Sequence, residues 1–259
     1  MKIATWNINS VRLRAELVAE FLREATPDVL CLQETKSPVD KLPLEFFEEQ
    51  GYAYHVARGF KGYNGVVILS KRPIVEEVAL DMCGRNDARH IGAKFENGVV
   101  IHNFYVPAGG DEPDREINEK FGHKLDFLEE MRAHFVANKP EKAVLVGDLN
   151  IAPLEDDVWS HKQLLKVVSH TPIEVETLAK VQDAGDWVDA VRATHPEGKL
   201  YSWWSYRGKE WETSDRGRRL DHIWCTPNLK SHIVSVDHFK PYRGKEKPSD
   251  HVPVMIDLQ

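Results

Sequence analysis

The chain has 259 residues, of which 42% are hydrophobic and 29% charged, a composition typical of a folded protein with a sizeable core. Its formal net charge of −7 excludes a histone-like protein that coats nucleic acid through bulk positive charge, but it allows a local basic face or a cation at an acidic centre. The sequence shows neither a signal peptide in MKIATWNINS nor an apolar run of membrane-spanning length, so we expect a cytoplasmic protein without a membrane partner.

Short β-strands are predicted along most of the chain, because runs rich in Val, Ile and aromatic residues alternate with Gly, Pro, Asn or Asp. Helices are predicted over residues 11–24 and, more clearly, over 117–136, where apolar residues recur at helical spacing. Residues 158–184 also contain helical stretches, with Pro172 as a break, and the sequence ENG at 96–98 predicts a hairpin turn. The predicted strands are residues 2–6, 28–32, 52–57, 66–70, 90–95, 99–105, 143–146, 222–226, 233–239 and 252–257.

Neither a composition shift nor a flexible linker divides the sequence, so we expect one domain over residues 1–259. The number of strands and the short hairpins favour two mainly antiparallel sheets that pack face to face, with helices outside. The three cysteines, Cys31, Cys83 and Cys225, are an odd number and lie far apart, which favours neither a disulfide framework nor a zinc site.

Five polar motifs directly adjoin predicted strands. They are Asn7 in IATWNIN, Gln33 and Glu34 in DVLCLQETK, Asp148 and Asn150 in AVLVGDLNIAP, Asp221 in RRLDHIW, and Asp250 with His251 in KPSDHVPV. Each motif has a plainer interpretation. Asn7 could cap a helix, Asp148 and Asn150 could form an Asx turn, and Asp221 could pair with Arg218 or Arg219.

The five motifs together favour a site for a hard cation. Mg²⁺ and Mn²⁺ prefer oxygen ligands, and strand ends on a rigid sheet can hold such ligands from several chain segments. A histidine beside a carboxylate adds a candidate general base. Carboxylates gathered at one place repel each other unless a cation or a proton neutralises them.

Seven motifs occur in one order along the chain. They are WNIN (6–9), LQETK (32–36), NFYVP (103–107), GDLNIAP (147–153), SWW (202–204), RGRRLDHIW (216–224) and KPSDHVPV (247–254). In this order they resemble the exonuclease III family of AP endonucleases, within the endonuclease/exonuclease/phosphatase superfamily. The resemblance covers essentially the whole chain. It implies a four-layer α/β sandwich, with two packed mainly antiparallel β-sheets flanked by helices.

The resemblance also implies an activity, namely Mg²⁺-dependent hydrolysis of DNA phosphodiesters, with Mn²⁺ as a substitute cation. Such enzymes cut 5′ to abasic sites, and many remove nucleotides and blocking groups from 3′ ends. The implied partner is therefore double-stranded DNA with abasic sites or 3′ ends. A monomer is the expected state, because nothing in the sequence indicates an obligate partner subunit.

Roles for single residues follow from the resemblance alone. Glu34 would be the main metal carboxylate, and His251 would lie at the scissile phosphate with Asp221 orienting its ring. Whether Asp148 or His251 removes the proton of the attacking water, and whether one metal or two act, stays open. The implied metal-site residues are Asn7, Glu34, Asp148, Asn150, Asp250 and His251, and the implied catalytic residues are Tyr105, Asp148, Asn150, Asp221 and His251.

The stretch KLYSWWSYRGKEW at residues 199–211 mixes aromatic with basic residues. One of Trp203 and Trp204 should be core, since neighbours on a strand face opposite ways. The resemblance implies that Trp203, with Leu220 nearby, lines the pocket for a flipped-out abasic sugar. Nearby basic residues predict a phosphate-binding rim, with Arg207 and Arg216 as its leading candidates. The basic residues of this region are Arg207, Lys209, Arg216, Arg218 and Arg219.

Two alternatives stay open at this point. Another hydrolase of the same superfamily, acting on RNA or on phospholipid headgroups, would share most of the polar motifs but not LQETK, RGRRLDHIW and the aromatic–basic strand in this form. A DNA-binding or scaffold protein without activity would not need the complete polar set. Residues 154–185 match the family pattern least, and their loops could contact DNA.

Overall fold

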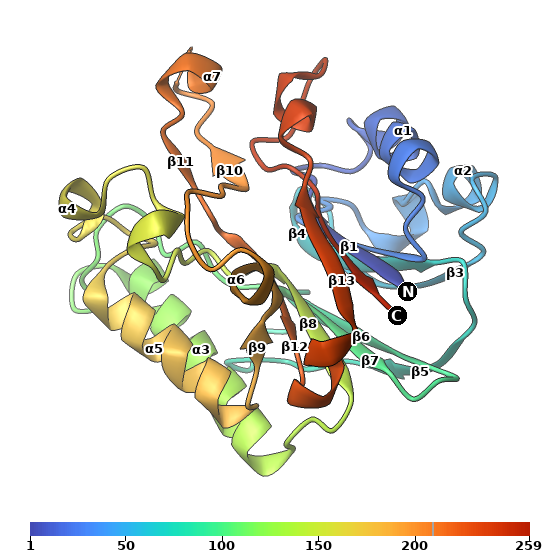
Figure 1. Cartoon of the computed structure of the whole chain (residues 1–259), viewed down its shortest axis with the longest axis horizontal. Coiled ribbons are helices and arrows are strands. Elements are labelled where there is room, and N and C mark those ends of the chain that lie inside the picture. The colour runs from blue at the N-terminus through green and yellow to red at the C-terminus, as the bar shows by residue number, and fades with distance from the viewer. Residues whose placement is uncertain (209) are drawn as a thin grey trace.

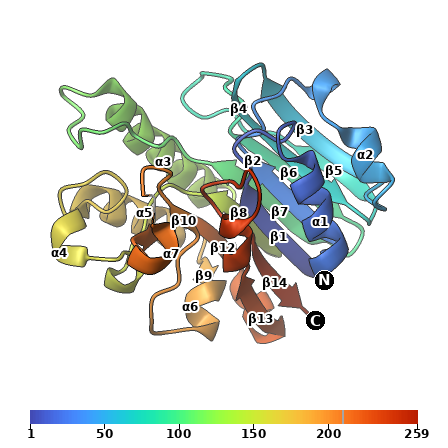
Figure 2. The ribbon, with the colours of Figure 1, turned by 90° about the horizontal axis from the view of Figure 1, so that it is seen from above.

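The strands form two six-stranded sheets that pack face to face, with helices on both outer faces (Figures 1 and 2). The computed structural model describes residues 1–208 and 210–259, so that Lys209 of the predicted rim lies outside the described residues. In spatial order the first sheet holds β13 (Ile233–His238), β14 (Val254–Leu258), β1 (Lys2–Asn7), β2 (Val29–Gln33), β4 (Tyr63–Ser70) and β3 (Tyr54–Phe60).

The second sheet has the same number of strands. In spatial order it holds β5 (Ile74–Val78), β6 (His90–Phe95), β7 (Val100–Tyr105), β8 (Ala143–Asp148), β12 (Asp221–Cys225) and β9 (Val188–Asp189). Of the described strand pairs, β1–β2 and β7–β8 run parallel and the others antiparallel. The short strands β10 (Trp203–Trp204) and β11 (Gly217–Arg218) form a separate antiparallel ribbon. The prediction of two mainly antiparallel sheets is confirmed.

Helices cover the outer face of each sheet. The α-helices are α1 (Ala15–Ala25), α2 (Leu44–Glu48), α3 (Glu119–Ala137), α4 (His161–Leu164), α5 (Pro172–Ala184), α6 (Ala190–Thr194) and α7 (Trp211–Ser214). In Figure 2, α1 and α2 lie over the first sheet, whereas α3 and α5 lie on the opposite side of the molecule. Across the described residues, no helix combines the length and apolar character that crossing a bilayer would require.

The alternation of side chains along each strand explains the four layers. In β1, Ile3 packs in the apolar core between the sheets, whereas Trp6 packs with residues of α1. In β8, Val144 faces the core between the sheets, whereas Leu145 packs with α3 and α5. Because successive residues point to opposite faces, each central strand contributes to two apolar cores. The layer order is therefore helix, sheet, sheet, helix, as predicted.

Local signals account for most element boundaries. Gly98 has φ of +80° and donates its N–H to the carbonyl of Phe95 at 2.9 Å, so the predicted hairpin between β6 and β7 is confirmed. Pro172, predicted to break a helical segment, instead begins α5, where its missing N–H costs nothing. Thr171 and Glu174 complete a capping box at that end.

A buried ion cluster holds the segment that leads into β12. Arg219 is fully buried, and its Nε and Nη2 donate to Asp157 Oδ1 and Oδ2 at 2.7 and 2.8 Å. Its Nη1 lies 2.8 Å from Asp189 Oδ2, and Arg192 Nη2 lies 2.5 Å from Asp157 Oδ1. Arg219 therefore faces the interior, and its prediction as a rim residue is wrong. The ion pairs fix the chain two residues before Asp221.

The cluster also sets how Asp157 titrates. Burial raises the pKa of Asp157, but the charges and hydrogen bonds of Arg219 and Arg192 outweigh burial and lower this pKa to about 2. A depressed pKa means that the folded state favours the carboxylate form. The stabilisation is therefore present at neutral pH and is lost as the pH falls from the ordinary aspartate pKa towards 2.

We expect Asp157→Asn to lower the free energy of unfolding by about 3–5 kcal/mol at pH 7, because Arg192 then loses its ion pair and the buried Arg219 keeps only the one to Asp189. At pH 3 the difference between wild type and variant should shrink by roughly 1 kcal/mol, since wild type then loses part of the carboxylate contribution. Urea unfolding at both pH values measures the two differences. Asp126→Asn, an exposed acid on α3, serves as the control. A difference that stays constant with pH would contradict the assignment.

Candidate active site

In the first sheet, strand direction brings three polar motifs to one edge. Strands β1 and β2 run parallel, with Asn7 opposite Gln33, so Asn7 and the residue after Gln33 lie at the same end. Strand β14 runs antiparallel to β1, and its first residue, Val254, pairs with Thr5. The segment that precedes β14 and holds Asp250 and His251 therefore lies at this end as well.

The second sheet contributes its motifs in the same way. Strands β7 and β8 run parallel and pair Tyr105 with Asp148 at their carboxyl ends. Strand β12 runs antiparallel to β8, so its first residue, Asp221, lies opposite Asp148. A hydrogen bond of 2.8 Å from Asn7 Nδ2 to Asp148 Oδ2 joins the two sheets at this edge. The predicted motifs from both halves of the chain thus meet.

The backbone is unusual where the site residues sit. Glu34 and Asn150 have φ of 55° and 54°, in the left-handed region, which Asn tolerates but which Glu seldom adopts. Gly147 has φ of +141°, and a Cβ there would lie 1.9 Å from the carbonyl oxygen of Phe104 on β7. The glycine is therefore required for the close approach of β7 and β8 beside the site.

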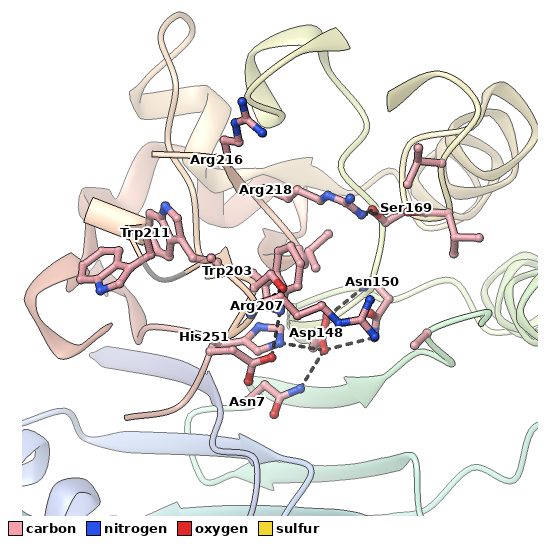
Figure 3. A pocket seen from close by; sticks show the side chains of 18 of the residues that line it. Asn7, Asp148, Asn150, Ser169, Trp203, Arg207, Trp211, Arg216, Arg218 and His251 are labelled. Carbon is pink, nitrogen blue, oxygen red and sulfur yellow. Dashed lines mark hydrogen bonds and ion pairs between the residues drawn. The ribbon is translucent and has the colours of Figure 1, made fainter. Parts of the chain in front are cut away.

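A carboxylate–imidazole–carboxylate arrangement lies at the centre of the site. His251 Nδ1 lies 2.7 Å from Asp221 Oδ2. On its other side, His251 Nε2 lies 3.7 Å from Asp148 Oδ2 (Figure 3). Asp148 Oδ2 also accepts hydrogen bonds from Asn7 Nδ2 at 2.8 Å and from Asn150 Nδ2 at 3.1 Å. The Asx turn is present too, since the Asn150 N–H donates to Asp148 Oδ1 at 3.0 Å. It holds Asn150 against Asp148 within the site.

The buried charges shift the pKa values of this arrangement. Burial lowers the pKa of His251, but the neighbouring carboxylates Asp221 and Asp148 raise it to about 10. Burial raises the pKa of Asp148 to about 7, although the positive charge of His251 acts in the opposite direction. These shifts favour the imidazolium form of His251, whose Nδ1–H then donates to Asp221, and they make Asp148 a weaker acid than an ordinary aspartate. Burial likewise keeps Tyr105 protonated by raising its pKa.

A second chain of polar contacts links Glu34 to Trp203. Glu34 Oε1 lies 2.9 Å from Lys36 Nζ, which also donates to Asn9 Oδ1 at 2.7 Å. Asn9 Nδ2 donates to Asp250 Oδ1 at 3.0 Å, and Trp203 Nε1 donates to Asp250 Oδ2 at 3.0 Å. Burial raises the pKa of Asp250, but the positive charge of His251 and these hydrogen bonds lower it overall, so Asp250 is ionised.

These residues surround an open cavity of about 760 Å³. Asp221 stands outside its lining, behind His251. The wall beyond the polar groups is aromatic and basic (Figure 3). The other residues predicted for the metal, the catalysis or the abasic sugar, and the two leading rim arginines, line the cavity, namely Asn7, Glu34, Tyr105, Asp148, Asn150, Asp250, His251, Trp203, Leu220, Arg207 and Arg216.

The two adjacent tryptophans separate as predicted. Trp203 lines the cavity, and Trp204 is 2% exposed and belongs to the core beneath α1. The Arg218 guanidinium lies 5.2 Å from the centre of the Trp203 ring, within reach of a cation–π contact. The cavity wall is therefore built from stacked aromatic and guanidinium groups.

Several cavity residues were missed in the sequence. Trp159, Val167, Val168 and Ser169 line the wall, and all belong to residues 154–185, which match the family pattern least. Trp211 belongs to the aromatic–basic stretch at residues 199–211, where aromatic content near Arg207 is a signal in the sequence. Trp159 has no such signal, because its partner Arg216, whose guanidinium lies 4.7 Å from the Trp159 ring centre, is far along the chain.

The donor set fits a hard cation. Asp148, Asp221 and His251 each offer a ligand atom within 4.8 Å of one another. Within the described part of the chain, the buried Asp221 Oδ1 has no hydrogen-bond partner. The carboxylates of Glu34 and Asp250 line the same cavity, so its polar side is rich in oxygen donors.

Comparisons with known proteins agree with this geometry. The model of the Endonuclease/Exonuclease/phosphatase family matches residues 4–251. Exodeoxyribonuclease III of Haemophilus influenzae is 29% identical over 274 residues, which cover 100% of each chain. An AP endonuclease from Archaeoglobus fulgidus superposes with a TM-score of 0.93 and 34% identity, over 100% of this chain and 99% of that one. The 3′ phosphatase NExo from Neisseria, bound to a product DNA hairpin, superposes with a TM-score of 0.92 and 30% identity, at the same coverage. The resemblance predicted from the motifs is confirmed, and this chain belongs to the endonuclease/exonuclease/phosphatase family.

Proposed function

We propose that the protein is a metal-dependent DNA-repair phosphodiesterase of the exonuclease III type, which cuts 5′ to abasic sites or removes nucleotides and blocking groups from 3′ ends. The arrangement of Asp148, His251 and Asp221 beside an open cavity carries this proposal, since it offers a base and a positive charge at one place. The relatives that cover the whole chain support it, because their names describe exodeoxyribonuclease, AP endonuclease and 3′ phosphatase activities.

We expect Glu34, Asn7 and Asp250 to hold Mg²⁺, with Mn²⁺ as a substitute, on the side of the cavity away from Asp221. A divalent cation held there would neutralise negative charge on the phosphate and on the leaving oxygen. Glu34 is partly exposed and pairs with Lys36 at 2.9 Å. Lys36 also donates to Asn9, which in turn donates to Asp250.

Asp148 is the better general base of the two residues left open by the sequence. Its pKa of about 7 leaves a substantial carboxylate fraction at neutral pH, as proton abstraction from water requires. The carboxylates of Asp221 and Asp148 raise the pKa of His251 to about 10, which favours the protonated ring and makes His251 the weaker candidate for removing a proton. Asn7 and Asn150 hold the Asp148 carboxylate in place by donating to it. The attacking water would lie between Asp148 and the phosphorus.

His251 acts as a fixed cationic donor towards the phosphate. Its Nδ1–H is held by Asp221, so the ring has one orientation and its Nε2–H faces the cavity side. The protonated ring stabilises the additional negative charge that develops on the phosphate oxygens in the transition state. Tyr105, neutral at physiological pH, supplies a second donor from the end of β7.

The cavity wall suits damaged duplex DNA. Arg207 and Arg216 provide positive charge for phosphates on a chain whose net charge is −7, so attraction to DNA is local to this rim. Trp203 and Leu220 form an apolar part of the wall. We expect these two residues to receive an extrahelical abasic sugar, because an apolar pocket of this kind selects by size rather than by base contacts.

Cleavage of defined duplexes tests the function directly. We expect Mg²⁺-dependent cutting of a duplex with one abasic-site analogue, or stepwise removal of nucleotides from a recessed undamaged 3′ end, with no product in EDTA. The ratio of the two products measures the balance of the activities. Failure to cleave either DNA in Mg²⁺ would refute the proposal.

Glu34→Ala should lose roughly 100-fold or more of the activity while staying folded, whereas Glu76→Ala, an exposed acid on β5, should behave as wild type.

The charge state of His251 can be measured without any cation. In EDTA, ¹⁵N NMR should show a doubly protonated His251 ring through pH 8, because Asp221 and Asp148 raise its pKa to about 10. Asp221→Asn should lower this pKa, since burial then acts against fewer negative charges. Asp183→Asn, an exposed acid on α5, is the control. A neutral His251 ring at pH 7 in wild type would contradict the assignment of Asp148 as base.

A further inference from the structure

Arg14 is a buried cation that bonds to backbone carbonyls. It lies directly before α1 and is 8% exposed. Each of the five N–H donors of its guanidinium has an acceptor, and within the described residues Arg14 forms no ion pair. Nε donates to the carbonyl of Lys247 at 2.9 Å. Nη1 donates to the carbonyls of Ile8 (3.3 Å) and Asn9. Nη2 donates to the carbonyl of Pro248 (2.9 Å) and to the hydroxyl of Tyr206 (3.0 Å).

The four carbonyls belong to the two segments that complete the site. Residues 8 and 9 directly follow Asn7, and residues 247 and 248 directly precede the segment 249–251. Ser249 Oγ donates to the carbonyl of Asn7 at 2.7 Å and accepts from the His251 N–H at 3.2 Å, which joins the same two segments a second time. Arg14 therefore fixes the start of the His251 segment against the end of β1.

Tyr206 extends this contact to the cavity rim. Its hydroxyl donates to the carbonyl of Pro248 at 2.8 Å, besides accepting from Arg14. Tyr206 directly precedes Arg207 of the rim, but it is 48% exposed and lies outside the cavity lining. The Arg243 guanidinium covers its ring at 5.0 Å and that of Trp211 at 5.3 Å. One hydroxyl thus connects the DNA-facing loop to the segment that carries His251.

We infer that Arg14 and Tyr206 are positioning residues, which couple the placement of His251 to the conformation of the rim loop at residues 205–208. The inference rests on the proposed phosphodiesterase function. The Pro248 carbonyl accepts one hydrogen bond from Arg14 and one from Tyr206, and these bonds restrict the His251 segment while the loop is in place. Displacement of a catalytic group by about 1 Å lowers turnover strongly, whereas it affects substrate binding far less. Both residues should thus act on kcat rather than on KM.

Tyr206→Phe is the most selective test, because it removes the two hydrogen bonds of the hydroxyl and keeps the ring beneath Arg243. We expect kcat for the better cleaved of the two DNAs to fall about 10-fold, with KM unchanged within about twofold. Tyr54→Phe, an exposed tyrosine on β3, should match wild type. An unchanged kcat in folded Tyr206→Phe, or a loss confined to KM, would overturn the inference.

Arg14→Ala gives a second test by chemical rescue. We expect kcat to fall by at least about 10-fold, and millimolar guanidinium chloride, compared with equal NaCl, to restore part of it by occupying the vacated position. Arg23→Ala, an exposed arginine on α1, should show neither loss nor rescue.

Since Arg14 and Tyr206 both act through the carbonyl of Pro248, the variant that carries both substitutions should lose less kcat than the product of the two single losses. Multiplicative losses without rescue would overturn the inference. If Arg14→Ala fails to fold, Tyr206→Phe decides alone.

The proposed phosphodiesterase function and the positioning role of Arg14 and Tyr206 would be refuted by different results. If wild type cleaves neither DNA, the proposed function fails, and the variants are then compared by the rate at which amide hydrogens of residues 249–251 exchange. Faster exchange in Tyr206→Phe than in Tyr54→Phe would support the positioning role, and equal exchange would overturn it. If wild type cleaves DNA and the variants do so equally well, the function stands and only the positioning role falls.

Discussion

The hydrogen bond from Asn7 to Asp148 joins the two sheets at the edge where the site is built, and the arrangement of the site depends on this contact. Each partner ends a central strand of its own sheet, β1 or β8. Parallel neighbours bring Glu34 and Tyr105 to the same edge, and antiparallel neighbours bring in His251 and Asp221 from the opposite chain direction. The face-to-face packing of the two sheets therefore sets the distances within the site.

Charge explains why such a site needs a cation and an imidazolium. Asp148 and Asp221 are both buried at adjacent strand ends, and like charges in a buried environment repel strongly. His251 lies between them, and both carboxylates raise its pKa, which favours a positive charge that compensates part of this repulsion. Glu34 and Asp250 lie towards the open cavity, where Lys36 and a bound cation can neutralise them. The acidic site thus sits within an acidic protein that has a local basic rim.

The sequence indicated the parts of this structure that depend on strand periodicity and on strand ends. Asn7, Asp148 and Asp221 follow or begin apolar strands, and a shared sheet edge then brings them together. What could not be read from the sequence are contacts between distant segments that lack a local pattern. Arg219 was assigned to the rim with its neighbour Arg218, although adjacent residues near a strand face opposite ways and Asp157 draws Arg219 inward. The bond from Arg14 to Lys247 spans 233 residues and has no periodic signature at all.

The central claim is that the strand ends at this shared edge form a cation site. Crystals soaked in Mn²⁺ and measured at the manganese absorption edge test it most directly, because the anomalous signal locates the ion independently of any assay. The account predicts a peak inside the cavity, coordinated by the carboxylate of Glu34 and adjoining Asn7 and Asp250. Ions bound only outside this cavity, at Mn²⁺ concentrations that saturate the enzyme, would contradict it.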